Sequence, residues 1–556
     1  MVKNICIVED KEDFEILFSK YKNNKCLFMP LDIKTFVLCK EKNVNIIEFN
    51  ESLTNNFHKL ALEETDRFIQ GIKFKKKLPY SLKSEIIGFL RFRFHSTIFL
   101  IETIEKNLEK YKIDKIFVSG IHKKNHSLHS AKICSEIVLE LFPNLTENLL
   151  KESKDKKKKI FKYTSEKQLL NKTKKIILSN GGYNFKRIKN KFKKLGFEIW
   201  LPSFKNLRFY ERFLYYANGY NIIDFSADKS TSLNEEIFIE KINFHYKNKY
   251  DLSGLLNSFY NKLNFHFNDL EQKIIALKKF VNQNNFSLLI SNVTRGLDGA
   301  ILDGDLKQPS LCIPHGVISK SLNKYDMIYK KNIAEAVFNG ESDYFAIQSK
   351  IMHQSLETHK IGGKPVITGN LIFSNNKNKD NYKNKYLLYA TTLKGFTNMQ
   401  YLGVDMFYEF WEILNDLNDL SKEVKFEIVV KIHPQFSMCK DDLAKHFKLL
   451  KFTNSRIDKL LEGAFSLVTL SSGTIEDALN SKVPVILYDN KKRYKQIECS
   501  LKYSKEESVY YINSKNELKI LLEQIKSFKT HKFDNYIYDG TFNNNFDQKI
   551  LPILKK

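Results

Sequence analysis

The stretch LVTLSSGTIEDALNSKVPVILYD, residues 467–489, decides the fold class of this 556-residue chain. Its apolar run at 467–470 predicts a strand, 471–474 a tight turn that opens a helix, and 483–488 a second strand. A strand, a helix and a strand in this order form a βαβ unit with parallel strands. The start of such a helix presents unpaired N–H groups and the positive end of the helix dipole. Small hydroxyl residues and Gly473 let an anion approach that backbone closely.

A second stretch, FEIVVKIHP at 426–434, ends a β-branched run in polar residues. In doubly wound sheets, ligands bind at the carboxyl ends of the strands. We therefore expect two walls of one phosphate site, with Glu476 two residues into the helix of the second wall. Either stretch alone is also typical of plain scaffold, and it is their combination that favours a site. The expected donor-side residues are Lys431, His433, Pro434, Ser471, Ser472, Gly473, Thr474 and Glu476.

The composition indicates a large basic protein. The formal net charge is +26, and hydrophobic residues make up 42% of the chain, enough for sizeable cores. The charge favours anionic partners, namely nucleotide-sugars, an acidic membrane face or nucleic acid. A lysine-solvated surface explains any single cluster equally well, and no RNA- or DNA-binding motif occurs, so we expect no nucleic-acid partner.

Cysteine and histidine usage argues against a disulfide frame and against a metal site. The seven cysteines are widely spread and form no CxxC pair, which indicates a reducing compartment. His122, His126 and His129 stand together without a Cys or carboxylate nearby. No signal peptide and no run of the ~18–20 apolar residues of a membrane span are present. We expect a cytoplasmic protein that needs no metal or cofactor, and peripheral attachment at the inner face of the plasma membrane stays open.

Alternating strand and helix patterns along the chain predict an α/β fold of two Rossmann-like domains that face a cleft. The sequence predicts an N-terminal α/β domain at 1–370 with helical insertions, and the Asn/Lys-rich stretch 371–386 as a linker. It predicts a nucleotide-binding domain at 387–535 and a segment at 536–556 that packs back on the first domain. The aromatic segment IIGFLRFRFHSTIFLIETI, 86–104, suits either a core helix or a membrane-surface helix, and we favour the core.

Three strand ends in the N-terminal domain carry candidate acceptor-side or catalytic residues. The turn after KKIIL holds Asn180, Gly181 and Gly182, which could approach an acceptor sugar or phosphate. The segment TRGLDGAILDGDLKQ, 294–308, carries Arg295, Asp298 and Asp303. His315 follows the strand PSLCIP.

Transfer from an activated phosphate requires two chemical tasks. N–H groups, hydroxyls and an imidazole or lysine must stabilise the charge of the leaving phosphate, for which His433, Ser472 and Thr474 are suited. A base must take the proton of the acceptor hydroxyl, for which Asp298, Asp303 and His315 are the candidates.

The HP and SS/ST pair resembles the motifs of bacterial sialyltransferases and capsule Kdo transferases, which are GT-B-fold glycosyltransferases of surface polysaccharides. In those families the pair holds the phosphate and ribose of a CMP-sugar. The wider pattern of His315-Gly316, Lys320, LLYATT, KIHP and LSSGTIEDAL also resembles CDP-glycerol glycerophosphotransferases of teichoic-acid synthesis. The resemblance covers about 310–490.

The two resemblances imply different bases. The glycerophosphotransferases imply His315 as the base and His433 as the phosphate partner, whereas the sialyltransferases imply an acidic residue before a glycine, Asp298 or Asp303. Glu476 resembles the ribose-contacting Glu of many GT-B enzymes, and a charge favoured by the helix dipole is the alternative. Both resemblances imply a cytidine-activated donor and no catalytic metal.

The function expected from these observations is transfer of a sugar, Kdo or a sialic-acid-like sugar, from a CMP-activated donor to a growing capsule or lipopolysaccharide. The expected partners are the nucleotide-sugar and an oligosaccharide or lipid-linked acceptor, with contact to an anionic membrane as a further option. The alternatives are a CDP-glycerol-type alditol-phosphate transferase and a nucleotide-sugar 2-epimerase. A nucleic-acid binder is the least favoured alternative.

Overall fold

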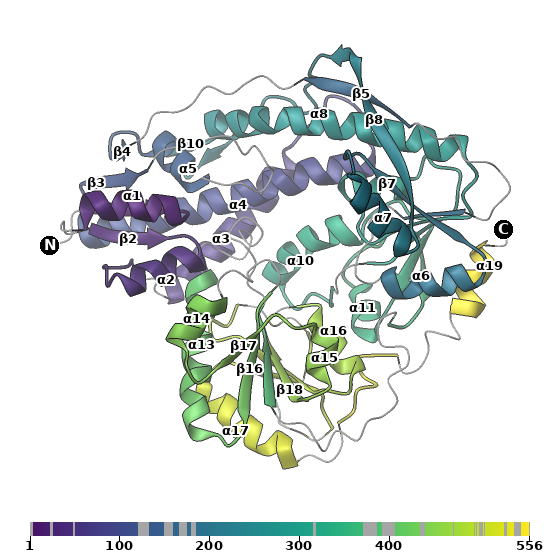
Figure 1. Cartoon of the computed structure of the whole chain (residues 1–556). Helices are drawn as coiled ribbons and strands as arrows, with labels where there is room; N and C mark the ends of the chain where they lie inside the picture. Colours follow the sequence, from purple (N-terminus) through teal and green to yellow (C-terminus); the bar gives the residue numbers. More distant parts are fainter. Residues whose placement is uncertain are drawn as a thin grey trace.

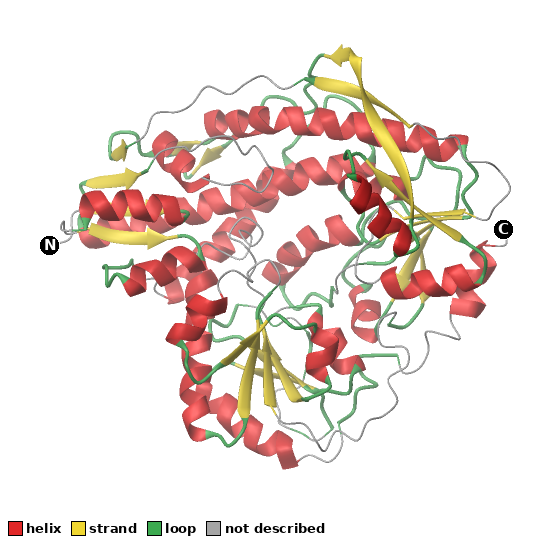
Figure 2. Cartoon of the chain, viewed as in Figure 1, coloured by secondary structure: helices red, strands yellow, loops and turns green. Residues whose placement is uncertain are grey.

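The computed structural model describes residues 4–22, 26–47, 51–119, 133–149, 159–165, 175–178, 185–314, 318–370, 386–391, 406–433, 440–470, 472–493, 495, 497–499, 504, 506–527, 531–538 and 546–554. Figure 1 shows three sheet-containing modules, joined by long helices that cross the upper half of the view. Helices cover the sheets on both faces, as Figure 2 shows by colour. No helix in these ranges is both long enough and apolar enough to cross a bilayer.

The first module is a parallel sheet of four strands in the order β2-β1-β3-β4. Its central strand β1 reads NICIV and is almost wholly buried, because parallel strands are covered on both faces. The following helices begin at side-chain caps: Asp10 accepts from the backbone of Asp13 at 2.9 Å, and Asp32 accepts from that of Thr35 at 2.7 Å. The elements are β1 (Asn4–Val8), α1 (Lys11–Tyr21), β2 (Cys26–Pro30), α2 (Ile33–Glu41), β3 (Lys115–Val118), α5 (Ile133–Leu141) and β4 (Thr146–Asn148).

The second module is a sheet of eight strands in the order β14-β13-β12-β11-β6-β7-β8-β5. Seven strands run parallel, and β5 pairs antiparallel with β8 at one edge. Its strands are β5 (Ile160–Ser165), β6 (Lys175–Leu178), β7 (Glu198–Ser203), β8 (Asn221–Leu233), β11 (Leu288–Ser291), β12 (Ser310–Cys312), β13 (Tyr344–Ile347) and β14 (Lys364–Ile367). Its helices are α6 (Phe185–Lys194), α7 (Phe209–Ala217), α9 (Gly296–Gly299), η1 (Ala300–Leu302), α10 (Lys324–Val337) and α11 (Lys350–Ser355).

The third module is a parallel sheet of six strands in the order β17-β16-β15-β18-β19-β20. Its strands are β15 (Tyr386–Ala390), β16 (Glu427–Lys431), β17 (Lys451–Thr453), β18 (Ala464–Thr469), β19 (Val485–Tyr488) and β20 (Val509–Ile512). Its helices are α13 (Met406–Glu423), α14 (Lys440–His446), α15 (Ile457–Leu461), α16 (Thr474–Asn480) and α17 (Lys515–Ser527).

Three long helices, α3 (Glu51–Gln70), α4 (Tyr80–Tyr111) and α8 (Ser253–Gln283), connect the first two modules. The short strands β9 (His245–Tyr246) and β10 (Tyr250–Asp251) lie just before α8. The aromatic segment of α4 lies in the core, where Phe94, Ile98 and Leu100 are fully buried. The preference for a core helix over a membrane-surface helix is therefore confirmed.

Two contacts join the third module to the rest of the chain. Helix α11 bridges two apolar cores, because Ile351 packs with α16 and β19, whereas Met352 packs with the core of the first two modules. Helix α2 makes the other contact, through Phe36, whose ring lies 5.1 Å from the Trp411 ring of α13. Near the chain's end, Ile550 and Ile553 of η5 (Phe546–Ile550) and α19 (Leu551–Leu554) pack in an apolar cluster of the eight-stranded sheet.

The predicted α/β class with two doubly wound parallel sheets is confirmed. The sequence reasoning assigned all strands before residue 370 to one sheet, and this was wrong. Strands β1 to β4 form a separate sheet, because α3 and α4 intervene between β2 and β3. The predicted linker falls largely at 371–385, outside the described residues.

Candidate functional site

The strand order of the six-stranded sheet locates its crevice. Numbered along the chain, the strands lie in the order 3-2-1-4-5-6, so the connections diverge between β15 and β18. In open parallel sheets, ligands bind at the carboxyl ends of the strands at this switch point. Ala390 pairs with Lys431, and Tyr389 pairs with Val468, so β15, β16 and β18 end at the same level. The segments that carry His433 and Ser472 therefore leave the same edge of the sheet, on opposite sides of β15.

Thr391, the first residue after β15, joins these strand ends. Its hydroxyl accepts a hydrogen bond from the backbone N–H of His433 at 3.0 Å. Its own backbone N–H donates to the carbonyl of Lys431 at 3.1 Å. The two bonds fix the half-buried His433 beside the switch point. Burial lowers the pKa of the neighbouring Lys431 ammonium.

The turn before α16 leaves room for a ligand. The backbone N–H of Thr474 donates to the Ser472 hydroxyl at 3.2 Å, which shapes the helix start. A Cβ placed on Gly473 would meet open space, so a ligand can approach this backbone closely. The buried Thr474 hydroxyl oxygen finds no hydrogen-bond partner among the described residues, an arrangement that proteins rarely leave unsatisfied. Ser471 and Pro434 lie outside the described residues.

Glu476 lies at the contact between the second and third modules. Its side chain is buried and hydrogen-bonds Ser349, the N-cap of α11, while its Oε1 atom has no partner in the part of the chain that the structure describes. Burial raises the pKa of this carboxyl to about 8. Ser349 follows the carboxyl end of β13, and Glu476 follows that of β18. The carboxyl edges of the two sheets therefore meet at this pair.

The eight-stranded sheet has a switch point of its own. Its parallel strands follow the order 7-6-5-4-1-2-3, and the connections diverge between β6 and β11. Asn180, Gly181 and Gly182 come shortly after β6 in the sequence and lie outside the described residues. Arg295 follows β11, and its Nε lies 3.6 Å from Oε2 of Glu85 on α4.

Glu85 adds a carboxyl group to this second switch point. Its side chain is 17% exposed, and burial raises its pKa although the Arg295 charge acts in the opposite direction. The backbone of Gly296 has φ +64° and runs so close to Glu85 that an added Cβ would come within 3.2 Å of the carboxylate. A glycine is therefore needed to turn the chain beside this acid.

The two aspartates named as candidate bases occupy different surroundings. Asp303 is buried and accepts from the Ser81 backbone at 2.9 Å and the Ser81 hydroxyl at 2.7 Å. Its Oδ2 also lies 2.8 Å from the Lys278 ammonium. These contacts occupy the carboxylate and indicate that Asp303 anchors the start of α4 to α8. Asp298 is half-buried on α9, next to the second switch point.

His315 lies outside the described residues, but the chain on both sides of it is held firmly. Pro314, just before it, accepts a hydrogen bond from Gln348 Nε2 at 3.0 Å. After it, the buried Lys330 ammonium donates to the Ser319 hydroxyl and to the Lys320 carbonyl, each at 2.8 Å. Both anchors fix the two ends of the short segment that carries His315.

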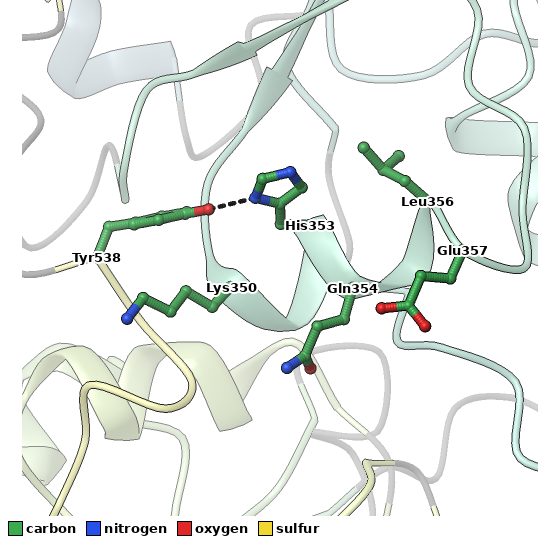
Figure 3. Close-up of a pocket in the computed structure, with 6 residues that line it drawn as sticks. All are labelled: Lys350, His353, Gln354, Leu356, Glu357 and Tyr538. Atoms are coloured by element: carbon green, nitrogen blue, oxygen red, sulfur yellow. Dashed lines mark hydrogen bonds between the residues drawn. The ribbon is translucent and has the colours of Figure 1, made fainter.

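A pocket of about 540 Å³ opens beside the contact between the modules (Figure 3). In Figure 3, His353 of α11 and Tyr538 point toward each other across it, and His353 Nδ1 lies 2.6 Å from the tyrosine hydroxyl. The Lys350 backbone N–H donates to the Tyr536 carbonyl at 3.0 Å, which ties the wall of the pocket to the third module. The lining residues are Lys350, His353, Gln354, Leu356, Glu357 and Tyr538.

Sequence reasoning missed three residues of this arrangement, namely Thr391, Ser349 and Glu85. The first two directly follow or nearly follow a strand, so the rule that selected His433 could have found them. Glu85 comes from a helix far away in sequence and gave no signal. Among the described residues no cluster of three potential metal ligands occurs, and His122, His126 and His129 lie outside them.

No family model matches the sequence, and no curated protein does. Among solved structures, the chain is similar to a variant of the wall teichoic acid polymerase TagF with CDPG, at 13% identity and a TM-score of 0.38, covering 69% of this chain and 88% of that one. It is also similar to Anabaena Alr3699/HepE with UDP and glucose, at 10% identity and 0.35, covering 69% and 97%. For S. aureus TarM the values are 10% and 0.37, covering 69% and 99%. Because these TM-scores lie below 0.5, the account of the site rests on the chain's own geometry.

Proposed function

We propose that this protein is a GT-B-type glycosyltransferase that moves a sugar from a CMP-activated donor to a growing surface polysaccharide. The observation that carries the proposal is the meeting of two carboxyl edges at Glu476 and Ser349. Each edge belongs to a doubly wound sheet with its own switch point. Two ligand-binding edges that face each other suit an enzyme that joins two substrates.

The third module, within 387–535, is the donor side of this proposal. The helix start at Ser472, Gly473 and Thr474 offers a phosphate N–H groups, open space and a hydroxyl that is unpartnered among the described residues. His433 approaches from the other side of β15 and donates a charge-assisted hydrogen bond when protonated. Such donors stabilise the negative charge that grows on the departing nucleotide phosphate. No metal is needed for this task when the donor set is complete.

The acceptor side of the proposal is the switch point of the eight-stranded sheet, within 1–370. Arg295, Asn180, Gly181 and Gly182 would position the acceptor hydroxyl, and one nearby group would take its proton. His315 and Asp298 are the candidate bases from the sequence, and Glu85 joins them because burial already raises its pKa. Asp303 leaves the set, since Lys278 and Ser81 occupy its carboxylate.

Release of CMP by the full-length protein tests this function. The protein is incubated with an oligosaccharide acceptor and, in turn, CMP-Kdo, CMP-sialic acid, CDP-glycerol and a UDP-sugar. The proposal expects release of CMP from a CMP-sugar that depends on the acceptor. Turnover of CDP-glycerol alone would instead identify an alditol-phosphate transferase. Conversion of the UDP-sugar without any acceptor would identify a 2-epimerase.

The base is identified by comparing Glu85→Gln, Asp298→Asn and His315→Asn under saturating donor. Loss of a general base lowers kcat by about 10²–10⁴-fold, and it also removes the corresponding limb of the pH–rate profile. A variant that lowers kcat while leaving the pH profile intact has lost positioning rather than proton transfer.

A further inference from the structure

Helix α7 (Phe209–Ala217) carries an unusually exposed apolar surface. None of its nine residues is buried. Phe209 is 86% exposed, Tyr216 72% and Phe213 61%, although aromatic side chains of this size normally lie inside a protein or at an interface. We call the following set the aromatic patch: Phe209, Tyr210, Phe213, Leu214 and Tyr216.

The aromatic patch occupies one side of the helix. At about 100° per residue, its members and Ala217 fall within one arc of roughly 160°. The opposite side holds the helix in place: Arg212 pairs with Asp224 of β8 at 2.6 Å, and Glu211 accepts from the Arg208 backbone at 2.7 Å. Figure 1 shows α7 in front of β7 and β8, so the arc faces outward from the sheet.

Basic residues surround the aromatic patch. Residues 204–219 contain Lys205, Arg208 and Arg212 against the single acid Glu211. Residues 185–196, around α6, contain six Lys and Arg and no acid. The two helices adjoin, because Lys189 of α6 donates to the Asn218 carbonyl at the end of α7 and Lys193 occupies the space beside Gly219. The patch therefore lies within a positively charged field.

We propose that the aromatic patch docks the protein on an anionic lipid bilayer. A convex helix with an apolar face and basic flanks lies in the membrane interface, where Phe and Leu enter the acyl boundary and Tyr stays at the headgroups. Each basic residue near the surface adds about 1 kcal/mol of attraction to anionic lipid. A carbohydrate site, in contrast, is concave and surrounds its ligand with converging polar groups.

The position of α7 adds a consequence for the reaction. The helix follows the carboxyl end of β7, the neighbour of β6, whose following turn was assigned to the acceptor side. Docking through α7 would bring that edge close to the bilayer, where lipid-linked acceptors reside. This consequence rests on the proposed function, whereas lipid binding is measured without donor or acceptor and can fail or succeed independently of it.

Co-sedimentation of the full-length protein with vesicles tests the proposal. Vesicles of phosphatidylcholine alone are compared with vesicles that contain an equal part of phosphatidylglycerol. The wild type is expected to sediment with the anionic vesicles and to be released by salt. Phe209→Ser with Phe213→Ser should lower the bound-to-free ratio at least about tenfold, because two large apolar side chains are lost. Ile275→Ser and Ile520→Ser, at equally exposed apolar positions elsewhere, should leave it unchanged.

A second variant excludes misfolding as the cause. Phe213→Trp keeps an aromatic residue, and its added fluorescence should be quenched by brominated lipid in anionic vesicles. Absence of quenching, equal sedimentation of the serine variant, or no sedimentation of the wild type overturns the proposal. A concentration-dependent dimer that the serine substitutions abolish would assign the patch to a second copy instead. Binding of the patch to acceptor oligosaccharide but not to vesicles would overturn it as well.

Discussion

The backbone N–H of His433 donates to the hydroxyl of Thr391 at 3.0 Å. This bond joins the carboxyl ends of β16 and β15, and β15 borders the switch point of the six-stranded sheet. The imidazole that the sequence singled out is thus positioned by a residue that the same reasoning passed over. A phosphate held there would meet His433 on one side of β15 and the start of α16 on the other.

Thr391→Val should weaken donor binding, because it removes the acceptor that fixes the backbone of His433 while preserving shape. A lost hydrogen bond of this kind costs about 0.5–1.5 kcal/mol, so the donor KM should rise several-fold. Thr103→Val is the matched control, since its hydroxyl also bonds a backbone carbonyl, but within α4. Steady-state kinetics check the prediction, and an equal effect of the two substitutions would remove Thr391 from the site.

Ser472→Ala should raise the donor KM with little change in kcat, because binding shared by ground and transition states affects KM alone. Its hydroxyl also accepts from the Thr474 backbone, so some stability is lost too. Ser514→Ala serves as control: its hydroxyl accepts from the Glu517 backbone at the start of α17. If both substitutions lower the melting temperature and neither changes KM, the turn before α16 is only a helix cap.

Glu476 should make stability depend on pH. Its pKa is about 8 in the folded protein and near 4.5 in the unfolded chain, so between these values the folded state holds a proton that the unfolded state has released. Stability from this group is present below pH 4.5 and is lost as pH rises toward 8, by at most about 1.4 kcal/mol for each pH unit.

Glu476→Gln keeps a neutral side chain of the same shape and should flatten this dependence. Urea unfolding at several pH values checks the prediction, with Asp477→Asn as the neighbouring control. A Glu476→Gln protein that loses stability with pH as steeply as the wild type would show that the carboxyl is already ionised in the fold.

Asp303→Asn should destabilise the protein rather than block a chemical step. The substitution leaves the Lys278 ammonium, whose side chain is 10% exposed, without its buried partner. Breaking a buried pair costs about 3–5 kcal/mol. Asp305→Asn removes the exposed partner of the same lysine and should cost less than about 1 kcal/mol. Unchanged stability together with a kcat lowered by orders of magnitude would restore Asp303 as the base.

The donor side was predictable from the sequence because its signals are local. KIHP and SSGT each follow an apolar run directly, and strand ends of a parallel sheet share one edge. The pairing order could not be read from the sequence, so Thr391 was not recognised as the residue between the two walls. The contact of Glu476 with Ser349 also depends on how two modules meet, and neither residue carries a mark of it in the sequence.

The acceptor side was less predictable because its parts come from distant segments. Asp303 and Asp298 look alike in LDGAILDGD, yet α4 and α8 bury one of them and leave the other beside the switch point. Glu85 reaches Arg295 from a helix that begins more than 200 residues earlier. The separate sheet formed by β1 to β4 was missed for the same reason, since nothing in the pattern of a parallel strand names the strand it pairs with.

Calorimetric titration with CMP tests the central claim most directly, by comparing wild type, His433→Ala and His446→Ala. His446 is a half-buried histidine of α14 in the same module and serves as control. The account predicts that the wild type binds CMP and that His433→Ala binds it at least about tenfold more weakly, since a charge-assisted hydrogen bond contributes about 1.5–3 kcal/mol. His446→Ala should bind as the wild type does. CMP affinity that is equal in His433→Ala and the wild type would contradict the account.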